Sequence, residues 1–283
     1  MKVLILGSTG ILGKTLNLFL SHKKNLIIDT ISSNKKNKYS LIFHNLNDLN
    51  KLQNLILEIK PTHIVNCIGI TKYNNSYNSK ALTNLVNTKL PLFLASLCLK
   101  YKIFFVHIST DCVFLGKKGN YADNAKKDSL DSYGISKSKG EVKNKYTSTI
   151  RTSFIGPETK NTKSLLNWFL IQKSIVNGFN NAFFSGLTSL ELSKIIYKYF
   201  IKKKILYNKI INVGGNKISK YSLLSIISKI FKKNIYIKKS PDFKIDRSLD
   251  SKNFRKISKY KKKSWEKMIK DLRQFMLKNK YNF

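Results

Sequence analysis

The sequence predicts an α/β fold in which a doubly wound parallel sheet is followed by a smaller C-terminal lobe. The chain opens with a short apolar run at 1–6, then the glycine-rich segment GSTGILG at 7–13 and an amphipathic helix. Strand-like apolar runs and helical patterns then alternate up to residue 155, which is typical of a Rossmann-type sheet. Beyond that point the alternation loosens. We therefore expect one domain over 1–155 and a second lobe over 156–283, with parts of the chain crossing between them.

The composition is that of a chain able to bury a core. It has 283 residues, of which 42% are hydrophobic and 12% aromatic. No apolar run approaches the ~20 residues of a membrane span, and no signal-peptide pattern opens the chain, so we expect a cytoplasmic protein. Cys67, Cys98 and Cys112 lie among apolar neighbours without metal-ligand spacing. They predict reduced thiols and no metal site.

The formal net charge of +38 allows two interpretations. One is binding to nucleic acid or to an anionic membrane surface. The other is a compositional drift towards Lys, Asn and Ile, with solvated lysines on every face. The lysines are spread along the whole chain, without a basic tail or an aromatic–basic motif. We therefore favour drift and expect no nucleic-acid partner, although a basic field would still favour anionic substrates.

The glycine segment at 7–13 stands between a strand and a helix, which is the context of a phosphate-binding turn. Gly7 allows the tight turn, Gly10 lets the backbone approach a pyrophosphate, and Gly13 lets helix and strand pack closely. The phosphates would lie over the free N–H groups at the start of the helix. The residues expected to line the cofactor here are Gly7, Ser8, Thr9, Gly10, Ile11, Leu12 and Gly13.

The end of the second predicted strand, 26–31, bears on the choice of cofactor. About 20 residues past the glycines an acidic residue would bind the ribose 2′-hydroxyl of NAD. Here Ser32 begins the segment SSNKK, which has hydroxyls and two lysines but no acid. This favours NADPH, with NADH as the alternative. Asp29 lies inside the strand pattern and is not assigned to the ribose.

The remaining elements follow from periodicity and from turn signals. We expect a strand piece at 41–43, then a helix that Asn47 or Asp48 caps and Pro61 ends. Strands are expected at 63–69 and 102–108, around a long helix at 79–99 that Pro91 kinks. After these we expect a strand at 148–155, a helix at 165–171, a loop at 179–188, a helix at 190–200, a strand at 210–213, a helix at 219–231 and a final helix around Trp265.

The stretch 109–141 contains the residues that suit proton chemistry. Tyr133 and Lys137 are four apart, so on a helix they share one face. A phenol has a pKa near ~10 and needs a nearby cation to act as a base at neutral pH. Thr110 could hydrogen-bond the reacting oxygen. The isolated histidines His44, His63 and His107 lack partner acids and are expected to be structural.

Four segments carry a resemblance to a known family: GSTGILG at 7–13, NCIG at 66–69, STDCVFLGKKGNY at 109–121 and YGISKSKGE at 133–141. Together they resemble the extended short-chain dehydrogenase/reductase superfamily, and within it the dTDP-4-dehydrorhamnose reductase (RmlD-like) group. The resemblance implies NAD(P)H-dependent reduction of the 4-keto group of a nucleotide-linked deoxysugar, for surface polysaccharide biosynthesis. A homodimer is one oligomeric state compatible with it.

The resemblance also implies catalytic roles. Tyr133 would protonate the ketone oxygen, and Thr110 would hydrogen-bond it. Lys137 would lower the pKa of Tyr133 and hold the nicotinamide ribose, and Asn87 would support a proton-relay water.

Further residues are implied as ligands of the cofactor and the substrate. Asn45 stands where relatives usually have an Asp towards the adenine, and Phe154 replaces a Trp that packs near the sugar. Arg247 is a candidate diphosphate ligand. The cofactor side comprises Ser32, Asn45, Leu46, Cys67, Ile68, Gly69, Tyr133 and Lys137, and the substrate side comprises Thr110, Asp111, Phe154 and Arg247.

Two alternatives remain beside the reductase. One is a nucleotide-sugar epimerase or dehydratase of the same superfamily, which would keep its cofactor bound through the cycle. The other is a catalytically idle scaffold or regulatory subunit. The presence of Thr110, Tyr133 and Lys137 argues against an idle protein, since such a site would be free to lose them.

Overall fold

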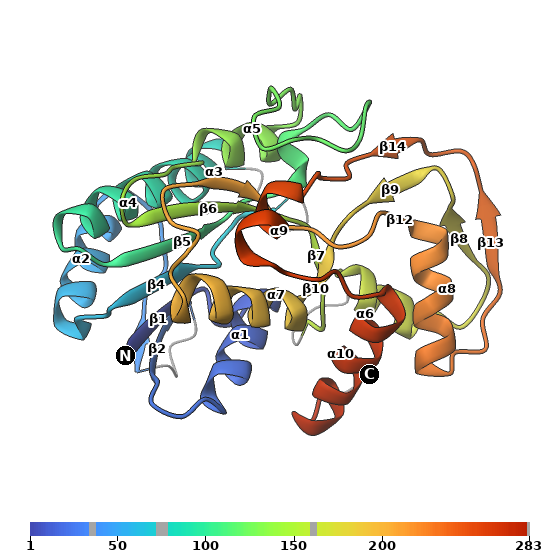
Figure 1. The fold of residues 1–283 in the computed structure, drawn as a ribbon, viewed down its shortest axis with the longest axis horizontal. Coiled ribbons are helices and arrows are strands. Elements are labelled where there is room, and N and C mark those ends of the chain that lie inside the picture. The colour runs from blue at the N-terminus through green and yellow to red at the C-terminus, as the bar shows by residue number, and fades with distance from the viewer. Residues whose placement is uncertain (34–37, 72–78, 159–162, 282–283) are drawn as a thin grey trace.

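A computed structural model describes residues 1–33, 38–71, 79–158 and 163–281. Its centre is a seven-stranded sheet in the order β11-β6-β5-β4-β1-β2-β3, with every neighbouring pair parallel (Figure 1). The strands are β1 (Lys2–Leu6), β2 (Ile27–Ser32), β3 (Tyr39–Ser40), β4 (His63–Asn66), β5 (Phe104–Ile108), β6 (Thr147–Arg151) and β11 (Ile210–Asn212). The predicted doubly wound α/β fold is confirmed. The strand order reverses between β1 and β4, where such sheets bind ligands.

Helices cover both faces of the sheet because its strands are apolar on both sides. In β1, Val3 and Ile5 join the core under α1 (Ile11–Ser21) and α7 (Ser189–Ile195), while Leu4 and Leu6 face the opposite core. That second core is covered by α2 (Asn47–Ile59) and α4 (Leu90–Lys100). Successive side chains of a strand point to opposite faces, so a continuous apolar run fills both layers.

The long helix predicted at 79–99 is continuous but not uniform. It consists of α3 (Lys80–Asn84), the π-helical turn η2 (Leu85–Lys89) and α4. By length and composition the stretch Lys80–Lys100 could cross a membrane, but 61% of its most apolar window is buried inside the protein. That burial is typical of the core helix of a soluble protein.

The C-terminal part supplies a small layer beside the sheet. Its strands are β7 (Phe154–Ile155), β8 (Val176–Phe179), β9 (Ala182–Phe184), β10 (Leu187–Thr188), β12 (Ile218–Ser219), β13 (Ile237–Ser240) and β14 (Ile245–Asp246). The other helical segments are η3 (Asp111–Val113), α5 (Ser132–Lys139), α6 (Leu165–Ile171), η4 (Ile196–Lys202), α8 (Lys220–Phe231), α9 (Lys252–Ser258) and α10 (Trp265–Lys278). β9 lies between β12 and β14, and β8 pairs with β13.

The chain crosses back to the main sheet after residue 155. β11 pairs with β6, and α7 packs on α1, where the hydroxyls of Thr15 and Ser189 lie 3.0 Å apart. One core cluster therefore runs from β1 to Phe184 and Trp265 of the C-terminal part. The assignment of separate roles to 1–155 and 156–283 stays a prediction.

Some short elements differ from the sequence prediction. The strand expected at 41–43 lies instead at Tyr39–Ser40, and the loop expected at 179–188 contains β9 and β10. β13, β14 and α9 were not predicted. Strands of two to four residues are too short to show an alternating pattern, and partner strands define them.

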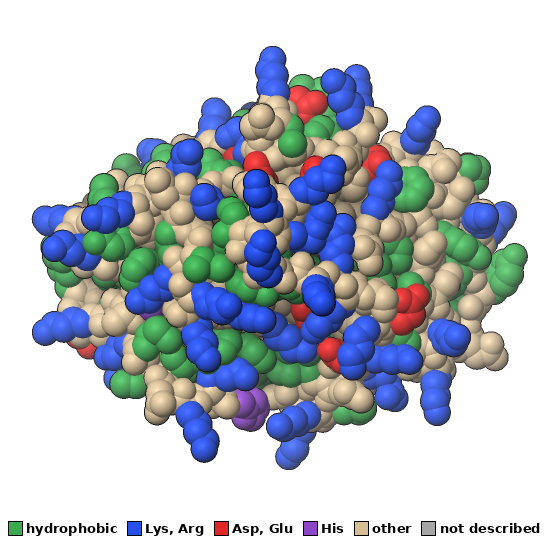
Figure 2. Space-filling model, in the orientation of Figure 1, with side chains coloured by type: hydrophobic (Ala, Val, Ile, Leu, Met, Phe, Trp, Pro, Cys, Tyr) green, Lys and Arg blue, Asp and Glu red, His purple; other side chains and the backbone are tan. Residues whose placement is uncertain are grey.

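Lysine and arginine side chains are scattered over the visible face and overlie many elements (Figure 2). They do not gather into a single stripe on this face, which is the distribution expected from compositional drift. The absence of a nucleic-acid partner stays a prediction.

Candidate active site

The glycine turn between β1 and α1 fits a bound pyrophosphate. Gly7 has φ +83°, a left-handed conformation that favours glycine. A Cβ on Gly13 would lie 2.2 Å from the Gly7 carbonyl oxygen, so only glycine allows this approach. A Cβ on Gly10 would meet only that same oxygen, at 3.5 Å, leaving open space beside it. Gly10 is the N-cap of α1 and offers no side-chain cap, so the helix presents its first N–H groups to a ligand.

The residues around the glycines differ in exposure, and their contact with a cofactor stays a prediction. Ser8 and Leu12 are buried, whereas Thr9 and Ile11 are half-buried. Cys67 and Ile68 follow β4 and lie against Gly7, where a Cβ on Gly7 would come within 3.1 Å of the Ile68 nitrogen. The end of β4 therefore packs against the glycine turn.

The segment after β2, where the ribose is expected to bind, is described only in part. Ser32 is buried at the end of β2, and Asp29 lies within β2, 3.9 Å from the Lys2 amine. Asp29 is thus away from the strand end, as predicted. Asn34, Lys35 and Lys36, on which the preference for NADPH rests, lie outside the described residues.

Asn45 and Leu46 lie exposed in the segment before α2. The buried carboxylate of Asp48 accepts the backbone N–H groups of His44 at 2.7 Å and Asn45 at 3.0 Å. These two hydrogen bonds hold the pKa of Asp48 down to about 2. Asp48 therefore anchors this segment, while the contact of Asn45 with an adenine stays a prediction.

Thr110 and Tyr133 meet at the carboxyl end of β5. The Thr110 hydroxyl caps η3 by accepting from the Cys112 N–H at 3.1 Å, and it donates to Asp111 at 3.3 Å. Burial raises the pKa of the Tyr133 phenol above its usual value, and a hydrogen bond with Thr110 only partly opposes this. Tyr133 therefore holds its proton throughout the neutral range, as a general acid requires.

Gly134 makes this meeting of Thr110 and Tyr133 sterically possible. A Cβ there would lie 2.1 Å from the Cys112 carbonyl oxygen and 2.1 Å from the Ser129 hydroxyl. Asp131 fixes the start of α5 by accepting from the Gly134 N–H at 2.8 Å. Sequence reasoning missed Gly134, because only the packing of α5 on η3 reveals its role.

Lys137 is buried one turn further along α5. Its amine donates to the Ile108 carbonyl oxygen at 2.7 Å and lies 3.4 Å from Nε2 of His107. Burial lowers the pKa of Lys137 to about 8, although the charge of Glu141 raises it. The largest effect on the pKa of Tyr133 in this conformation comes from burial and not from Lys137. Its expected effect on the phenol stays a prediction for the cofactor-bound protein.

Asn87 lies in the π-helical turn η2, a type of helix irregularity that is frequent at functional sites. Its side-chain oxygen accepts from the Ile70 N–H at 2.9 Å. Its amide donates to the Ile70 carbonyl oxygen at 2.9 Å and to Ser136 at 3.0 Å. Asn87 thus ties the segment after β4 to α5, while its role with a relay water stays a prediction.

Two of the expected substrate residues, Asp111 and Arg247, lie together at η3, whereas Phe154 lies in β7. Arg247 follows β14 and donates to the Phe114 carbonyl oxygen at 3.0 Å, and one of its terminal nitrogens lies 3.7 Å from Asp131. Asp111 is buried, and burial raises the pKa of its carboxyl group although Arg247 opposes this. Phe154 is half-buried in β7.

Lys220, the first residue of α8, was not predicted as part of the site. Its charge, like that of Arg247, acts to lower the pKa of Asp111. Burial lowers the pKa of Lys220 itself. No motif in the sequence marks it, because α8 is brought beside η3 only by the fold.

A hollow of about 450 Å³ opens beside Arg247. Four lysines and one carboxylate are among the residues that line it: Lys117, Lys118, Lys217, Lys244 and Asp246. Lys217 is paired with Asp246. The segment 115–118 thus forms one wall of a basic hollow.

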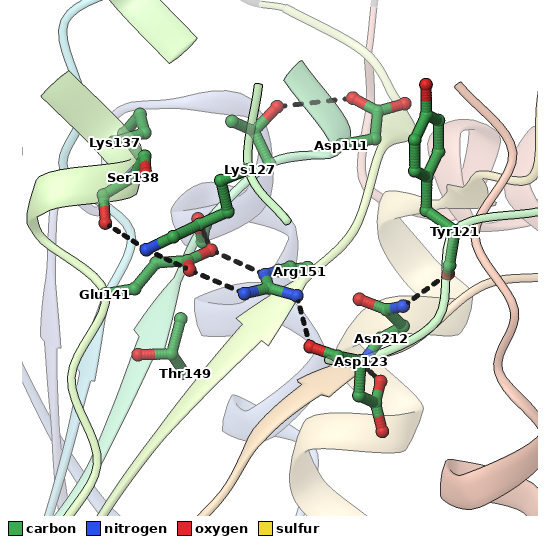
Figure 3. Close-up of polar contacts among 12 residues, drawn as sticks. Asp111, Tyr121, Asp123, Lys127, Lys137, Ser138, Glu141, Thr149, Arg151 and Asn212 are labelled. Atoms are coloured by element: carbon green, nitrogen blue, oxygen red, sulfur yellow. Dashed lines mark hydrogen bonds and ion pairs between the residues drawn. The ribbon is translucent and has the colours of Figure 1, made fainter. Parts of the chain in front are cut away.

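A buried ion pair holds α5 against β6 (Figure 3). Both carboxylate oxygens of Glu141 accept from the Arg151 guanidinium at 2.8 Å. Lys127 lies 3.3 Å from the same carboxylate, and the Ser109 hydroxyl donates to it at 2.9 Å. Arg151 also donates to the Asp123 carbonyl oxygen at 2.7 Å. The pair anchors the segment that follows α5 and so supports Tyr133 and Lys137.

The fold is a parallel sheet with helices on both faces. A glycine turn follows its first strand, and the set Thr110, Tyr133 and Lys137 follows its fifth. This is the organisation of the extended short-chain dehydrogenase/reductase superfamily. Residues 1–167 match the RmlD substrate binding domain family. This match covers more than half of the chain, and the chain belongs to that family.

Individual relatives agree with this assignment. A dTDP-4-keto-6-deoxy-D-glucose reductase of Streptomyces niveus is 36% identical over 83 residues, which are 29% of each protein. A hypothetical dTDP-4-dehydrorhamnose reductase from Sulfolobus tokodaii is 27% identical, with a TM-score of 0.74 and coverage of 91% and 94%. The Bacillus anthracis dTDP-4-dehydrorhamnose reductase, solved in complex with NADP, has a TM-score of 0.80 at 19% identity, covering 97% and 99%. At that identity the last similarity establishes the fold alone.

Proposed function

We propose that the chain is a cytoplasmic, NADPH-dependent reductase of the 4-keto group of a nucleotide-linked deoxysugar, acting in surface polysaccharide biosynthesis. One observation carries the proposal. The protonated phenol of Tyr133 lies against the Thr110 hydroxyl at the carboxyl end of β5, in the same sheet whose first strand ends in the glycine turn. A ketone oxygen placed at these two groups would receive a hydrogen bond and a proton from protein atoms.

The cofactor fits the residues of the crevice. Gly10 leaves room for a pyrophosphate over the start of α1, while Gly7 and Gly13 shape the turn that places it there. Bound there, NADPH would supply the hydride. Lys137 would hold the nicotinamide ribose, and the segment 67–69 would line the crevice beside it. NADH is the second choice, since the segment after β2 has no acid to bind a ribose 2′-hydroxyl.

The chain's own groups divide the remaining work. Thr110 orients the ketone oxygen, and Tyr133 donates the proton as negative charge develops on that oxygen. General acid catalysis of this kind contributes about 10²–10⁴-fold. Arg247 and the basic hollow beside it favour an anionic diphosphate. In this proposal residues 1–155 bind the cofactor, and most of 156–283 binds the sugar nucleotide.

The function is tested by incubating the purified chain with NADPH and a panel of nucleotide-linked 4-keto-deoxysugars. A reductase consumes NADPH in proportion to the sugar reduced and releases oxidised cofactor. An epimerase or dehydratase keeps its cofactor bound and changes the sugar without net consumption of NADPH. Binding of NADPH without turnover of any sugar would favour an idle scaffold.

A Gly10→Ala substitution is expected to weaken NADPH binding about tenfold or more without loss of stability. The added Cβ would lie 3.5 Å from the Gly7 carbonyl oxygen, which is an ordinary van der Waals contact. It would however occupy the space left for the pyrophosphate, and such overpacking costs about 1–3 kcal/mol. Titration of NADPH fluorescence measures the affinity, and thermal unfolding measures the stability. Gly13→Ala is the contrast, since its Cβ would clash at 2.2 Å and should lower both. Wild-type affinity in Gly10→Ala would contradict the proposed cofactor position.

A further inference from the structure

His107 is a buried histidine that connects two parts of the site. It lies on β5 opposite Asn66 of β4 in the parallel register, and both side chains are fully buried. The Asn66 amide nitrogen is 3.3 Å from Nδ1 of His107, and Nε2 of His107 is 3.4 Å from the Lys137 amine. The sequence suggested a structural histidine, but the fold places it between the end of β4 and the lysine of the site.

The hydrogen bonds fix which ring nitrogen of His107 carries the proton. The Ile68 N–H donates to the Asn66 side-chain oxygen at 3.1 Å, so the amide nitrogen must face His107. An amide nitrogen only donates, and Nδ1 must therefore be an unprotonated acceptor. Burial, together with the charge of Lys137, pushes the pKa of His107 well below its usual value, so the ring is neutral. Its single proton is then on Nε2.

This tautomer sets a requirement on Lys137. An Nε2–H that points at the lysine amine finds an acceptor only when the amine is uncharged. A charged Lys137 would need the proton on Nδ1 instead, and the Asn66 amide would then have to turn and lose its bond from Ile68. Protonation of Lys137 is thereby coupled to the backbone at Ile68, which borders the glycine turn.

We propose that Asn66 and His107 are positioning residues that hold Lys137 through the tautomer of His107 and couple the protonation of Lys137 to the turn at 67–69. The identity of the tautomer stands on the hydrogen bonds alone, whereas its consequence for catalysis rests on the proposed reductase function. Neither residue touches the reacting atoms in this arrangement.

Other titratable groups also act on Lys137. Among the described residues these are Glu141, in the segment after α5, and Cys67, in the segment after β4, and both raise the pKa of Lys137. His107 on β5 is the neutral neighbour at hydrogen-bond range. The Ile108 carbonyl oxygen accepts from the amine in either protonation state.

The first test determines the tautomer of His107 and needs no activity assay. The chain is labelled with ¹⁵N-histidine, and two-bond correlations in its NMR spectrum show which ring nitrogen of His107 is protonated. A proton on Nε2 above about pH 8, where Lys137 is uncharged, is the expected result. A proton on Nδ1 in that pH range in the wild-type chain overturns the proposal, whatever the enzyme assays show.

The second test is Asn66→Asp, whose carboxylate can accept from both the Ile68 N–H and Nδ1–H of His107. The proton should move to Nδ1, leaving Nε2 as an acceptor for the charged amine. The alkaline limb of NADPH affinity, expected near pH 8 from Lys137, should then move up by about 1 unit, because a nearby opposite charge favours the ammonium. An unchanged limb overturns the coupling.

His63→Leu is the matched control. His63 is a second buried histidine in the same sheet, on β4 opposite Phe104, and its Nε2 has no hydrogen-bond partner among the described residues. Removing His63 should leave the alkaline limb of NADPH affinity in place, and a similar shift in this variant would contradict a specific role of His107.

If the wild-type chain does not bind NADPH at all, the reductase proposal fails, while the NMR result still decides the tautomer.

Discussion

Tyr133→Phe is expected to lower kcat/KM for the 4-keto sugar by about 10²–10⁴-fold, the usual contribution of a general acid. The substitution removes one oxygen from a half-buried ring and leaves α5 unchanged, since its start is fixed by Asp131 and Gly134. Thr110 would keep its bonds to Cys112 and Asp111. The loss should therefore appear in turnover, while NADPH affinity and the unfolding temperature stay close to wild type.

Tyr146→Phe provides the control for removing a phenol oxygen elsewhere. Tyr146 precedes β6 and packs edge-on against Phe104, at the opposite end of β5 from Thr110. This variant should keep wild-type turnover. Full turnover in Tyr133→Phe, measured as NADPH consumption under the same conditions, would remove Tyr133 from the mechanism.

The residues that the sequence identified are those whose role depends on local structure. The glycine spacing at 7–13 predicts a turn, and the structure finds Gly7 at positive φ and Gly13 against the Gly7 carbonyl group. The spacing of Tyr133 and Lys137 predicts one helix face, and both lie on α5. Such patterns are set within a few residues of chain, so they can be interpreted before the fold is known.

The residues that the sequence missed depend on contacts between distant elements. Gly134 matters because α5 meets η3, and Lys220 matters because α8 is brought beside Asp111. His107 gains its role because Asn66 faces it across two neighbouring strands. No local pattern distinguishes these residues from an ordinary glycine, lysine or histidine, since their partners are 22 to 109 positions away along the chain.

Glu141→Gln is expected to lower the free energy of unfolding by about 3–5 kcal/mol, because breaking a buried ion pair leaves its partner uncompensated. The Glu141 side chain is fully buried, and the Arg151 side chain is only 4% exposed. Glutamine has the same shape, but its amide cannot accept hydrogen bonds from both nitrogens of the Arg151 guanidinium. It also cannot balance the positive charge of Lys127. Denaturant unfolding of the whole chain measures the change.

The Glu141→Gln variant also tests an electrostatic effect, because the charge of Glu141 stabilises the ammonium form of Lys137. Glu141→Gln should move the alkaline limb of NADPH affinity to lower pH, opposite to the shift expected of Asn66→Asp. Lys252→Gln is the control for losing an ion pair at the surface, since Lys252 is 80% exposed and lies 3.9 Å from Asp250. Such pairs contribute about 0–1 kcal/mol. A loss in Glu141→Gln no larger than in this control would mean that the buried pair does not hold α5 against β6.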